Sequence, residues 1–223
     1  MPTISAIEPQ KKRQNRFNLF LDGQFSLSIS QETLVRYHVK VGQQLDQPLL
    51  EEIVKGEQYA ALFNRALHFL SYRPRSEKEV RDFLKRITKR ESDSIHAVVV
   101  ESVMSKLAEI GQVDDLAFAK WFVESRLRAR PKGVRLLKME LAQKGVDREV
   151  VDEAVSIVQK EQGHEGNIDE VELAYRAVAK KAPGWQKLDA RRFREKVTGF
   201  LGRRGFDWDT IKAVIDRLRP GRV

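Results

Sequence analysis

Two stretches of this chain repeat one pattern at an offset of 60 residues. The segment LAQKGVD at residues 141–147 aligns with LGRRGFD at residues 201–207, and the apolar positions after them keep the same offset. Each copy ends an amphipathic stretch at a glycine and places an aspartate two residues later. Glycine ends helices because it adopts positive φ without steric cost, and aspartate starts them by accepting bonds from free amides. The pattern therefore predicts tandem units built from helices.

A third, more divergent copy precedes these two. Leu84 lies 57 residues before Leu141, although Thr88 stands where the glycine would fall and a longer connection follows. Ser76 and Glu79 form an S-x-x-E capping box that would start the second helix of this copy. Three-helix units of about 50 to 60 residues have marginal cores alone, so we expect them to stack into an elongated, curved molecule.

The middle unit has the clearest helix boundaries. Asp114 is expected to cap a helix that runs to about Arg130, and the turn at residues 131–133 leads to a helix that ends at Gly145. The second acid of the pair, Asp115, is explained by the same capping and by the helix dipole.

The fold class is predicted to be mainly α, with a small β-containing module at the N-terminus. Apolar residues alternate on both sides of Asp22-Gly23, which indicates a β-hairpin because this pair favours a tight turn with positive φ. These apolar residues are Phe17, Leu19, Leu21, Phe25, Leu27 and Ile29. Short helices from about Gln31 and from Pro48 to Glu57 complete the module. The predicted segments are a flexible basic arm at 1–15, the hairpin module at 16–58, helical units at 59–111, 112–161 and 168–219, and a linker at 162–167.

The balance of charges gives the first indication of function. Lys and Arg number 41 against 32 Asp and Glu, which gives a formal net charge of +9. A basic field of this kind attracts nucleic acid, an acidic protein surface or an anionic membrane. The start of the chain has no apolar segment of signal-peptide length, and no apolar run approaches the ~20 residues of a membrane span. We therefore expect a cytoplasmic protein that does not bind membranes.

No arrangement of residues indicates an enzyme. The chain has no cysteine, and its four histidines are scattered. Neither a phosphate-binding loop nor a nucleophile elbow is present in the sequence. We therefore expect no catalytic activity, no cofactor and no metal site.

A set of residues, in its order and spacing, resembles the RecX regulatory proteins of bacteria. The set covers roughly Ala60 to Arg219 and comprises Arg75-Ser76-Glu77, Gly111, Asp114-Asp115, Phe118-Ala119, Arg126, Lys132-Gly133, Arg135, Glu140-Leu141 and Lys144-Gly145. The resemblance implies a protein without catalytic activity that binds the RecA recombinase and its filament on single-stranded DNA. Members of the family typically restrain RecA by blocking filament growth and by lowering its ATPase and strand-exchange activities. We expect a monomer whose binding to DNA alone is weak and steeply salt-dependent.

Two basic clusters are the predicted contacts with an acidic RecA surface or with phosphates. Residues 120–144 hold eight basic and two acidic residues, and residues 176–204 hold ten and two. Arginine suits both targets because it donates bidentate bonds to carboxylates and phosphates. The candidates are Arg126, Arg128, Arg130, Lys132, Arg135 and Lys138 in the first cluster, and Trp185, Arg191, Arg192, Arg194, Arg203 and Arg204 in the second. The competing interpretation of the first cluster is a solvated face in which Arg126 forms a local ion pair.

The three tryptophans are assigned to two different roles. Trp185 is a contact candidate because it stands in an expected loop, beside a helix break at Pro183-Gly184. Trp121 and Trp208 are expected to be partly buried in the core.

A second hypothesis is a DNA-binding regulator with a helix-turn-helix. Its recognition helix would run from Val134 to Lys144. This helix offers Arg135 and Gln143 for reading bases but no asparagine, and the hypothesis leaves the repeat without a purpose.

Overall fold

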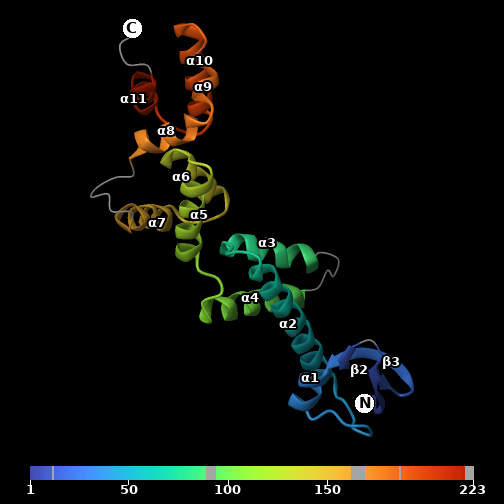
Figure 1. Ribbon diagram of the computed structural model, residues 1–223. Coiled ribbons are helices and arrows are strands. Elements are labelled where there is room, and N and C mark those ends of the chain that lie inside the picture. Colours follow the sequence, from blue (N-terminus) through green and yellow to red (C-terminus); the bar gives the residue numbers. More distant parts are fainter. Residues whose placement is uncertain (12, 89–93, 162–168, 186, 219–223) are drawn as a thin grey trace. The chain divides into compact units, whose positions relative to one another are not determined.

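The computed structural model of the chain (Figure 1) describes residues 1–11, 13–88, 94–161, 169–185 and 187–218. The chain divides into two compact units. One contains Met1–Ser71 and Arg81–Ile110, and the other contains Tyr72–Val80 and Gly111–Val223. The linker predicted at residues 162–167 lies outside the described residues.

The first compact unit begins with an antiparallel sheet in the order β1-β2-β3. β2 (Arg13–Leu21) and β3 (Gln24–Ser30) form the predicted hairpin. Asp22 and Gly23 connect them with φ values of 47° and 83°, as a tight hairpin turn requires.

The flexible arm predicted at residues 1–15 is wrong. Ile4–Gln10 form β1, which pairs with β2 along the sheet. The side chain of Ile4 is fully buried in the core under the sheet, so the segment is held by apolar burial as well as by strand pairing.

The hairpin departs from the predicted alternation at Phe25. A register shift between Leu19 and Phe20 pairs Phe25 with Phe20 rather than with a core residue. The two rings meet edge to face with centroids 6.0 Å apart, and Phe25 remains 58% exposed. The other apolar residues of the hairpin pack in or against the core, as predicted.

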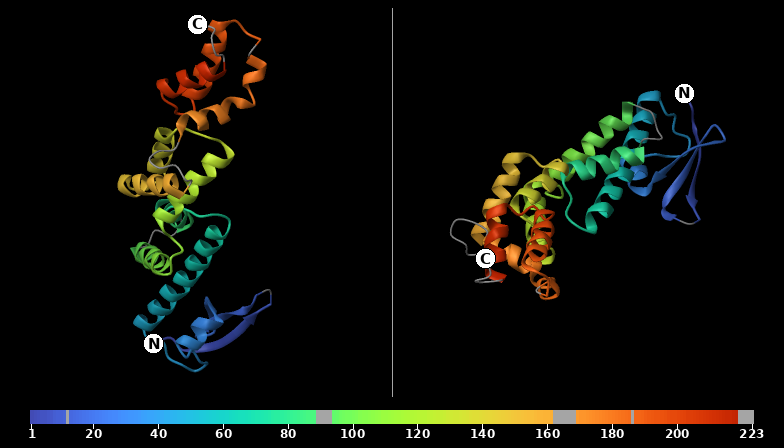
Figure 2. Two further views of the ribbon diagram at one scale, coloured as in Figure 1. Left: turned by 60° about the vertical axis from the view of Figure 1, so that its left-hand side comes forward. Right: turned by 90° about the horizontal axis from the view of Figure 1, so that it is seen from above.

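A single helix, α2 (Gln47–Ser71), runs through the boundary predicted after residue 58 (Figure 2). The sequence indicates separate helices on the two sides of this boundary, and that prediction is wrong. Gly56 lies inside the helix, where its missing Cβ makes room for Tyr37, whose hydroxyl lies 3.3 Å from the place a Cβ would take. α2 therefore supplies Ile53 to the core of the sheet and Leu62 to the helices that follow.

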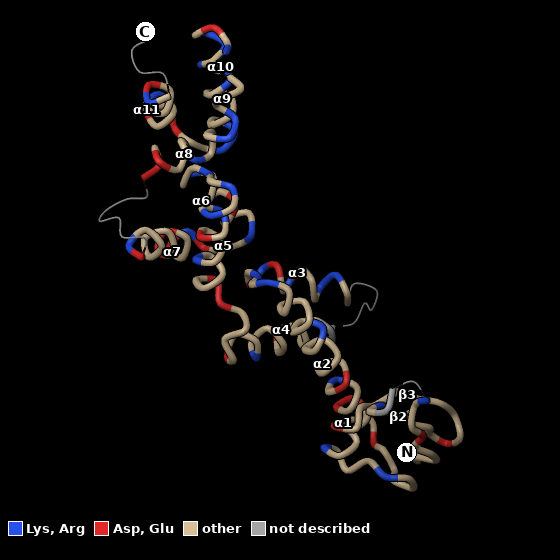
Figure 3. The backbone as a smooth tube through the Cα atoms, in the orientation of Figure 1, with Lys and Arg blue, Asp and Glu red and all other residues tan. Residues whose placement is uncertain are grey.

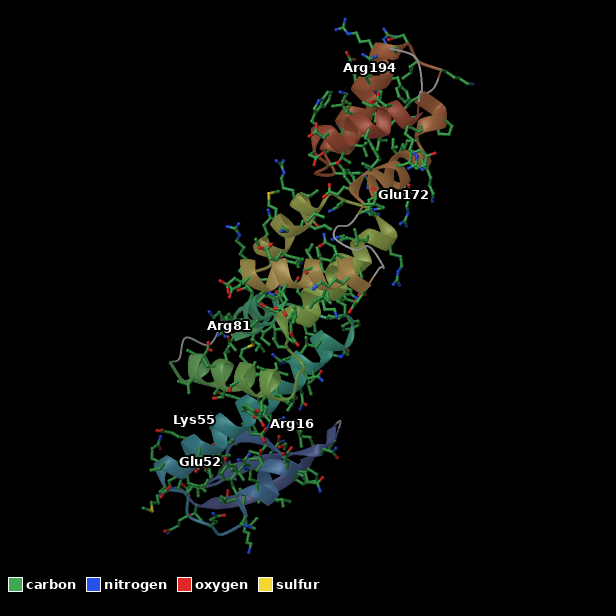
Figure 4. The ribbon with its side chains drawn as sticks, turned by 90° about the vertical axis from the view of Figure 1, so that its left-hand side faces the viewer. Arg16, Glu52, Lys55, Arg81, Glu172 and Arg194 are labelled. Atoms are coloured by element: carbon green, nitrogen blue, oxygen red, sulfur yellow. The ribbon has the colours of Figure 1, made fainter. Side chains whose placement is uncertain are left out.

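Glu57 links α2 to the sheet. Its carboxylate accepts bonds from the N–H and the hydroxyl of Ser30, both at 2.7 Å, and pairs with Arg16 at 3.1 Å. Arg16 is labelled beside α2 in Figure 4. Ser30 is the N-cap of the short helix α1 (Gln31–Arg36), so a carboxylate from a later element holds the start of this helix.

The first three-helix domain consists of α2, α3 (Glu77–Thr88) and α4 (Ser94–Glu109). The capping box predicted at the start of α3 is confirmed. Ser76 Oγ accepts from the Glu79 N–H at 3.2 Å, and the Glu79 carboxylate accepts from the Ser76 N–H at 3.4 Å.

The second compact unit contains the other two three-helix domains. The second domain has α5 (Asp115–Ala129), α6 (Val134–Gln143) and α7 (Arg148–Glu161). The third has α8 (Glu170–Ala179), α9 (Ala182–Trp185), α10 (Ala190–Gly202) and α11 (Trp208–Leu218). The predicted interruption between the helix ending near Lys181 and the helix from Asp189 is present, but Pro183 and Gly184 lie in the one-turn helix α9 rather than in a loop. Proline is tolerated in the first turn of a helix, where an N–H has no helical partner.

The predicted repeat is confirmed in three dimensions. Gly145 and Gly205 both have a φ of 82°. The residues after them, Val146 and Phe206, are buried, and each donates its N–H to the carbonyl of the leucine five positions earlier, at 3.2 and 3.3 Å. The buried apolar side chains of the second and third domains form one continuous cluster.

The start of α3 contacts the second domain through a set of bonds that we name the first junction. Ser76 donates its hydroxyl to the Lys144 carbonyl at 2.7 Å, and Asp115 accepts from the Glu77 N–H at 2.7 Å. A Cβ on Gly145 would lie 2.6 Å from a side-chain Cβ of α3. The glycine that ends α6 therefore also permits close approach to α3.

The start of α6 contacts the third domain in the same way, through the second junction. Gly133 donates its N–H to the Arg204 carbonyl at 2.9 Å, and Glu170 accepts from the Val134 N–H at 3.0 Å. A Cβ on Gly205 would lie 2.4 Å from a side-chain Cβ of α6. Each junction thus joins a helix start to a glycine turn and a carboxylate of the following domain.

Candidate partner-binding surface

Part of the first basic cluster is neutralised inside the second domain. Glu140 on α6 forms ion pairs with Arg126 and Lys132. Asp152 on α7 pairs with Lys138 at 2.6 Å. The local ion pair that we considered for Arg126 is thus present, and these three cations join helices of the same domain.

Lys120 and Lys144 are also paired, with Glu161 at 3.0 Å and Glu79 at 2.8 Å, which leaves three arginines among the candidates of this cluster. Arg128 and Arg130 at the end of α5 and Arg135 in the first turn of α6 are exposed to solvent. Within the described part of the chain none of them forms an ion pair with a carboxylate. Figure 3 shows basic positions along α5 and α6. These three guanidinium groups are available to an anionic partner.

The second basic cluster lies mainly on α10. Arg191 pairs with Glu195 at 3.1 Å and Arg192 with Asp189 at 3.6 Å, while the two arginine side chains remain 90% and 74% exposed. Ion pairs this exposed contribute little to stability, so both guanidinium groups can exchange partners. Arg194, labelled in Figure 4, is exposed and has no carboxylate partner among the described residues.

The two arginines before Gly205 differ in their environment. Arg203 is exposed, and its guanidinium lies along α10 near Gly199. Arg204 is partly buried, donates to the Pro131 carbonyl at 3.2 Å and lies 4.5 Å from the ring of Phe200. Arg204 therefore belongs to the second junction rather than to the free surface.

The structure corrects the loop predicted for Trp185 and the core position predicted for Trp208, while the role of Trp185 as a contact stays a prediction. Trp185 ends α9 instead of lying in a loop, and its ring packs edge to face on Phe200 with centroids 5.6 Å apart. Trp208 is 61% exposed at the start of α11, although it was expected in the core. Trp121 packs against the core as predicted.

The carboxylates of the junctions have shifted pKa values. Burial raises the pKa of Asp115 and of Glu170, although each accepts a backbone N–H that acts in the opposite direction. Burial also acts to raise the pKa of Glu79, but hydrogen bonds from Arg73 and Lys144 outweigh it and lower this pKa to about 2. Glu79 is therefore a charged partner at the first junction.

The described surface offers cationic chemistry. Among these residues no group of three or more His, Asp or Glu side chains is arranged to hold a metal ion. No helix in the same part of the chain is both long and apolar enough to cross a membrane.

Comparison with known proteins matches this series of domains. The sequence fits the RecX N-terminal domain over residues 2–46 and the first, second and third RecX three-helix domains over 63–87, 114–155 and 168–215. The regulatory protein RecX of Bacillus velezensis is 34% identical over 217 residues, which cover 97% of this chain and 78% of that protein. The chain belongs to the RecX family. The RecX protein of Bacillus subtilis is 35% identical over 98% of this chain and 78% of its own length.

Solved RecX structures have the same fold. A crystal structure of regulatory protein RecX superimposes with a TM-score of 0.68 at 27% identity and covers 97% of this chain and 100% of that chain. The structure of RecX from Lactobacillus salivarius gives 0.58 at 25% identity, over 73% of this chain and 97% of that chain. A mainly helical RecX fold, with three three-helix domains after a small sheet, is therefore established for this chain.

Sequence reasoning missed the carboxylates that join the RecX domains. Asp115 was assigned to the capping of its own helix, and Glu170 was given no role. A signal was present, because each acid follows directly on the aspartate that caps the first helix of its domain, Asp114 or Asp169. Aligning these two positions would have shown that the acid recurs.

Proposed function

We propose that this RecX protein binds the RecA recombinase and its filament on single-stranded DNA in the cytoplasm, without catalysis of its own. Bound there, it limits filament growth and lowers the ATPase and strand-exchange activities of RecA. The observation that carries this proposal is the match to the N-terminal domain and all three helical domains of the RecX family, together with curated relatives over nearly the whole chain.

The free cations of the second compact unit support an anionic partner. Arg128, Arg130 and Arg135 leave their guanidinium groups without carboxylates among the described residues, while neighbouring cations are already paired. An exposed guanidinium binds carboxylates or phosphates through charge-assisted bonds, which are stronger than bonds between neutral groups. A RecA filament on DNA presents both kinds of anion.

The helix-turn-helix hypothesis is disfavoured by the second junction. A recognition helix reads bases with residues near its N-terminus. In α6 the first turn is occupied, because Gly133 and Val134 donate their N–H groups to the third domain and Leu136 packs against its glycine turn. This leaves Arg135 and Gln143 as isolated exposed side chains.

The direct test is RecA-catalysed ATP hydrolysis on single-stranded DNA with increasing amounts of this protein. We expect inhibition at substoichiometric amounts, because a protein that blocks filament growth acts on many RecA subunits at once. Unchanged hydrolysis even at equimolar protein would contradict the proposal.

Charge reversal tests the surface itself. The triple variant Arg128→Glu, Arg130→Glu, Arg135→Glu should weaken filament binding by about ten-fold or more, since each change replaces an attraction by a repulsion. Lys132 is left unchanged because its reversal would also break the pair with Glu140. The control reverses three exposed cations of the first compact unit, Lys40, Lys55 and Arg65. Equal binding by both variants would show that the first cluster is not a contact surface.

A further inference from the structure

In the first and second three-helix domains, the following domain covers the beginning of the second helix, α3 or α6. The second long helix of the third domain, α10, has no following domain among the described residues. At α3 this surface receives Asp115 and the Lys144 carbonyl, and at α6 it receives Glu170 and the Arg204 carbonyl. In both cases the covering groups are a carboxylate and the carbonyl end of a helix, which are negative. The chain thus contains two examples of a helical element that docks at this position through a carboxylate and a helix-end carbonyl.

No other domain covers the corresponding part of α10 among the residues that the structure describes. The third residue after the capping residue contacts the next domain at both junctions, as Glu79 does through Lys144 and Leu136 does at Gly205. Arg192 has this position in α10, where it lines a surface hollow of about 550 Å³. The other lining residues are Leu188, Glu195, Lys196, Gly199 and Arg203.

The hollow is positively charged and has an apolar part. Arg192 has only an exposed partner at 3.6 Å, and Lys196 and Arg203 form no ion pair with any described carboxylate. Gly199 has no side chain to fill the space between these cations, and Leu188 adds apolar surface. These cations and the apolar surface together suit a protein partner whose folded backbone carries several separate carboxylates.

We propose that the hollow along α10 is a docking surface for an acidic helical segment of a protein partner, placed much as the second and third domains are placed on α3 and α6. The inference rests on the proposed function in one respect, since we take the protein partner to be RecA. A nucleic acid strand fits the hollow less well, because Glu195 stands among the cations and would repel a continuous row of phosphates.

The test uses the full chain and the double variant Lys196→Glu, Arg203→Glu, which leaves Arg192 and its partner intact. The matched control is Lys160→Glu, Lys212→Glu, two exposed cations of α7 and α11 in the same compact unit. Binding is measured to RecA without DNA, to RecA filaments on single-stranded DNA, and to a single-stranded oligonucleotide alone. Circular dichroism and thermal unfolding establish that both variants are folded.

We expect the α10 variant to bind RecA without DNA about ten-fold more weakly than the control variant, with the same affinity for the oligonucleotide. Wild-type binding to RecA by the α10 variant would overturn this inference alone. An equal loss for RecA and for the oligonucleotide would also overturn it and assign the hollow to nucleic acid. If the unaltered chain failed to bind RecA in any form, the proposed function and this inference would both fall.

Discussion

The two junctions of the second compact unit have the same arrangement but are built from different chemistry. At the first junction a buried hydroxyl, that of Ser76, meets the carbonyl before the glycine turn, and Glu79 and Lys144 add an ion pair at 2.8 Å. At the second junction the backbone N–H of Gly133 meets the equivalent carbonyl. At this position the first junction uses a side chain and the second a direct contact between main chains.

The difference has consequences for tolerance to mutation. A side-chain interface can adjust by rotating a bond, whereas two main chains in contact leave no atom that can move independently. A Cβ on Gly133 would lie 2.3 Å from the Gly205 carbonyl oxygen and 2.6 Å from its carbonyl carbon. The second junction should therefore be the more specific and the more easily broken of the two.

The largest effect is expected for Gly133→Ala. The added methyl must displace the backbone of the third domain, which should lower the free energy of unfolding by about 2 to 3 kcal/mol. Urea unfolding followed by circular dichroism measures this loss. Gly202→Ala is the control, because a Cβ there meets nothing within 4 Å. Equal stability of the two variants would mean that the main chains are not in contact.

A smaller effect is expected at the equivalent position of the first junction. Ser76→Ala removes a buried hydroxyl that both caps α3 and satisfies the Lys144 carbonyl, at a cost of about 1 to 2 kcal/mol. Ser102→Ala, which removes an exposed hydroxyl from α4, is the control. Ser76→Gly should still allow α3 to lie close to the Gly145 turn, as Gly133 allows α6 to lie close to the Gly205 turn. If Ser76→Ala lowered the free energy of unfolding by more than Gly133→Ala, the first junction would be the more easily broken of the two.

A dependence on pH, no larger than the effect of Ser76→Ala, distinguishes the two junctions. Glu79 has a pKa of about 2 in place of the ordinary 4.5, so its stabilisation is complete above pH 4.5 and is lost as the pH falls toward 2. With allowance for solvent screening this amounts to about 1 to 2 kcal/mol. Glu170 has a raised pKa, so protonation favours the folded state, and its contribution improves as the pH falls through that value.

Unfolding curves of the wild type, Glu79→Gln and Glu170→Gln across this pH range measure the two contributions. The difference between wild type and Glu79→Gln should shrink toward pH 2, and the difference for Glu170→Gln should change in the opposite direction. The raised pKa of Asp115 gives the first junction a further pH dependence of the same sign as that of Glu170. Asp115 is unchanged in both variants, so its contribution cancels when each variant is compared with the wild type. Parallel curves for all three proteins would show that neither carboxylate is coupled to folding.

Features set by neighbouring residues were predictable from the sequence. The Asp114 cap, the capping box of α3, the hairpin turn at Asp22-Gly23 and the glycine at residue 145 depend on a few residues each, and all are confirmed. The repeat was predictable for the same reason, since it copies a local pattern. The fold class followed from these signals together with the charge-rich composition.

Features set by distant contacts were not predictable in this way. β1 places Ile4 in a core formed with residues as distant as Ile53, and Gly56 within α2 packs against Tyr37. The exposure of Trp208 and the partial burial of Trp185 depend on how α9 and α11 pack, which periodicity does not specify. For the basic clusters, the sequence located the charge, but the pairing of individual cations required the structure.

The uninterrupted course of α2 limits how this protein can be divided or recombined. Its first half belongs to the core of the sheet and its second half to the first helical domain, and the family match to that domain begins only at residue 63. A fragment cut at that residue would keep fewer than the ~12 helical residues that are marginal even in favourable peptides. The sheet and the first helical domain therefore share one helix, and we expect that a fragment containing only one of them would not fold.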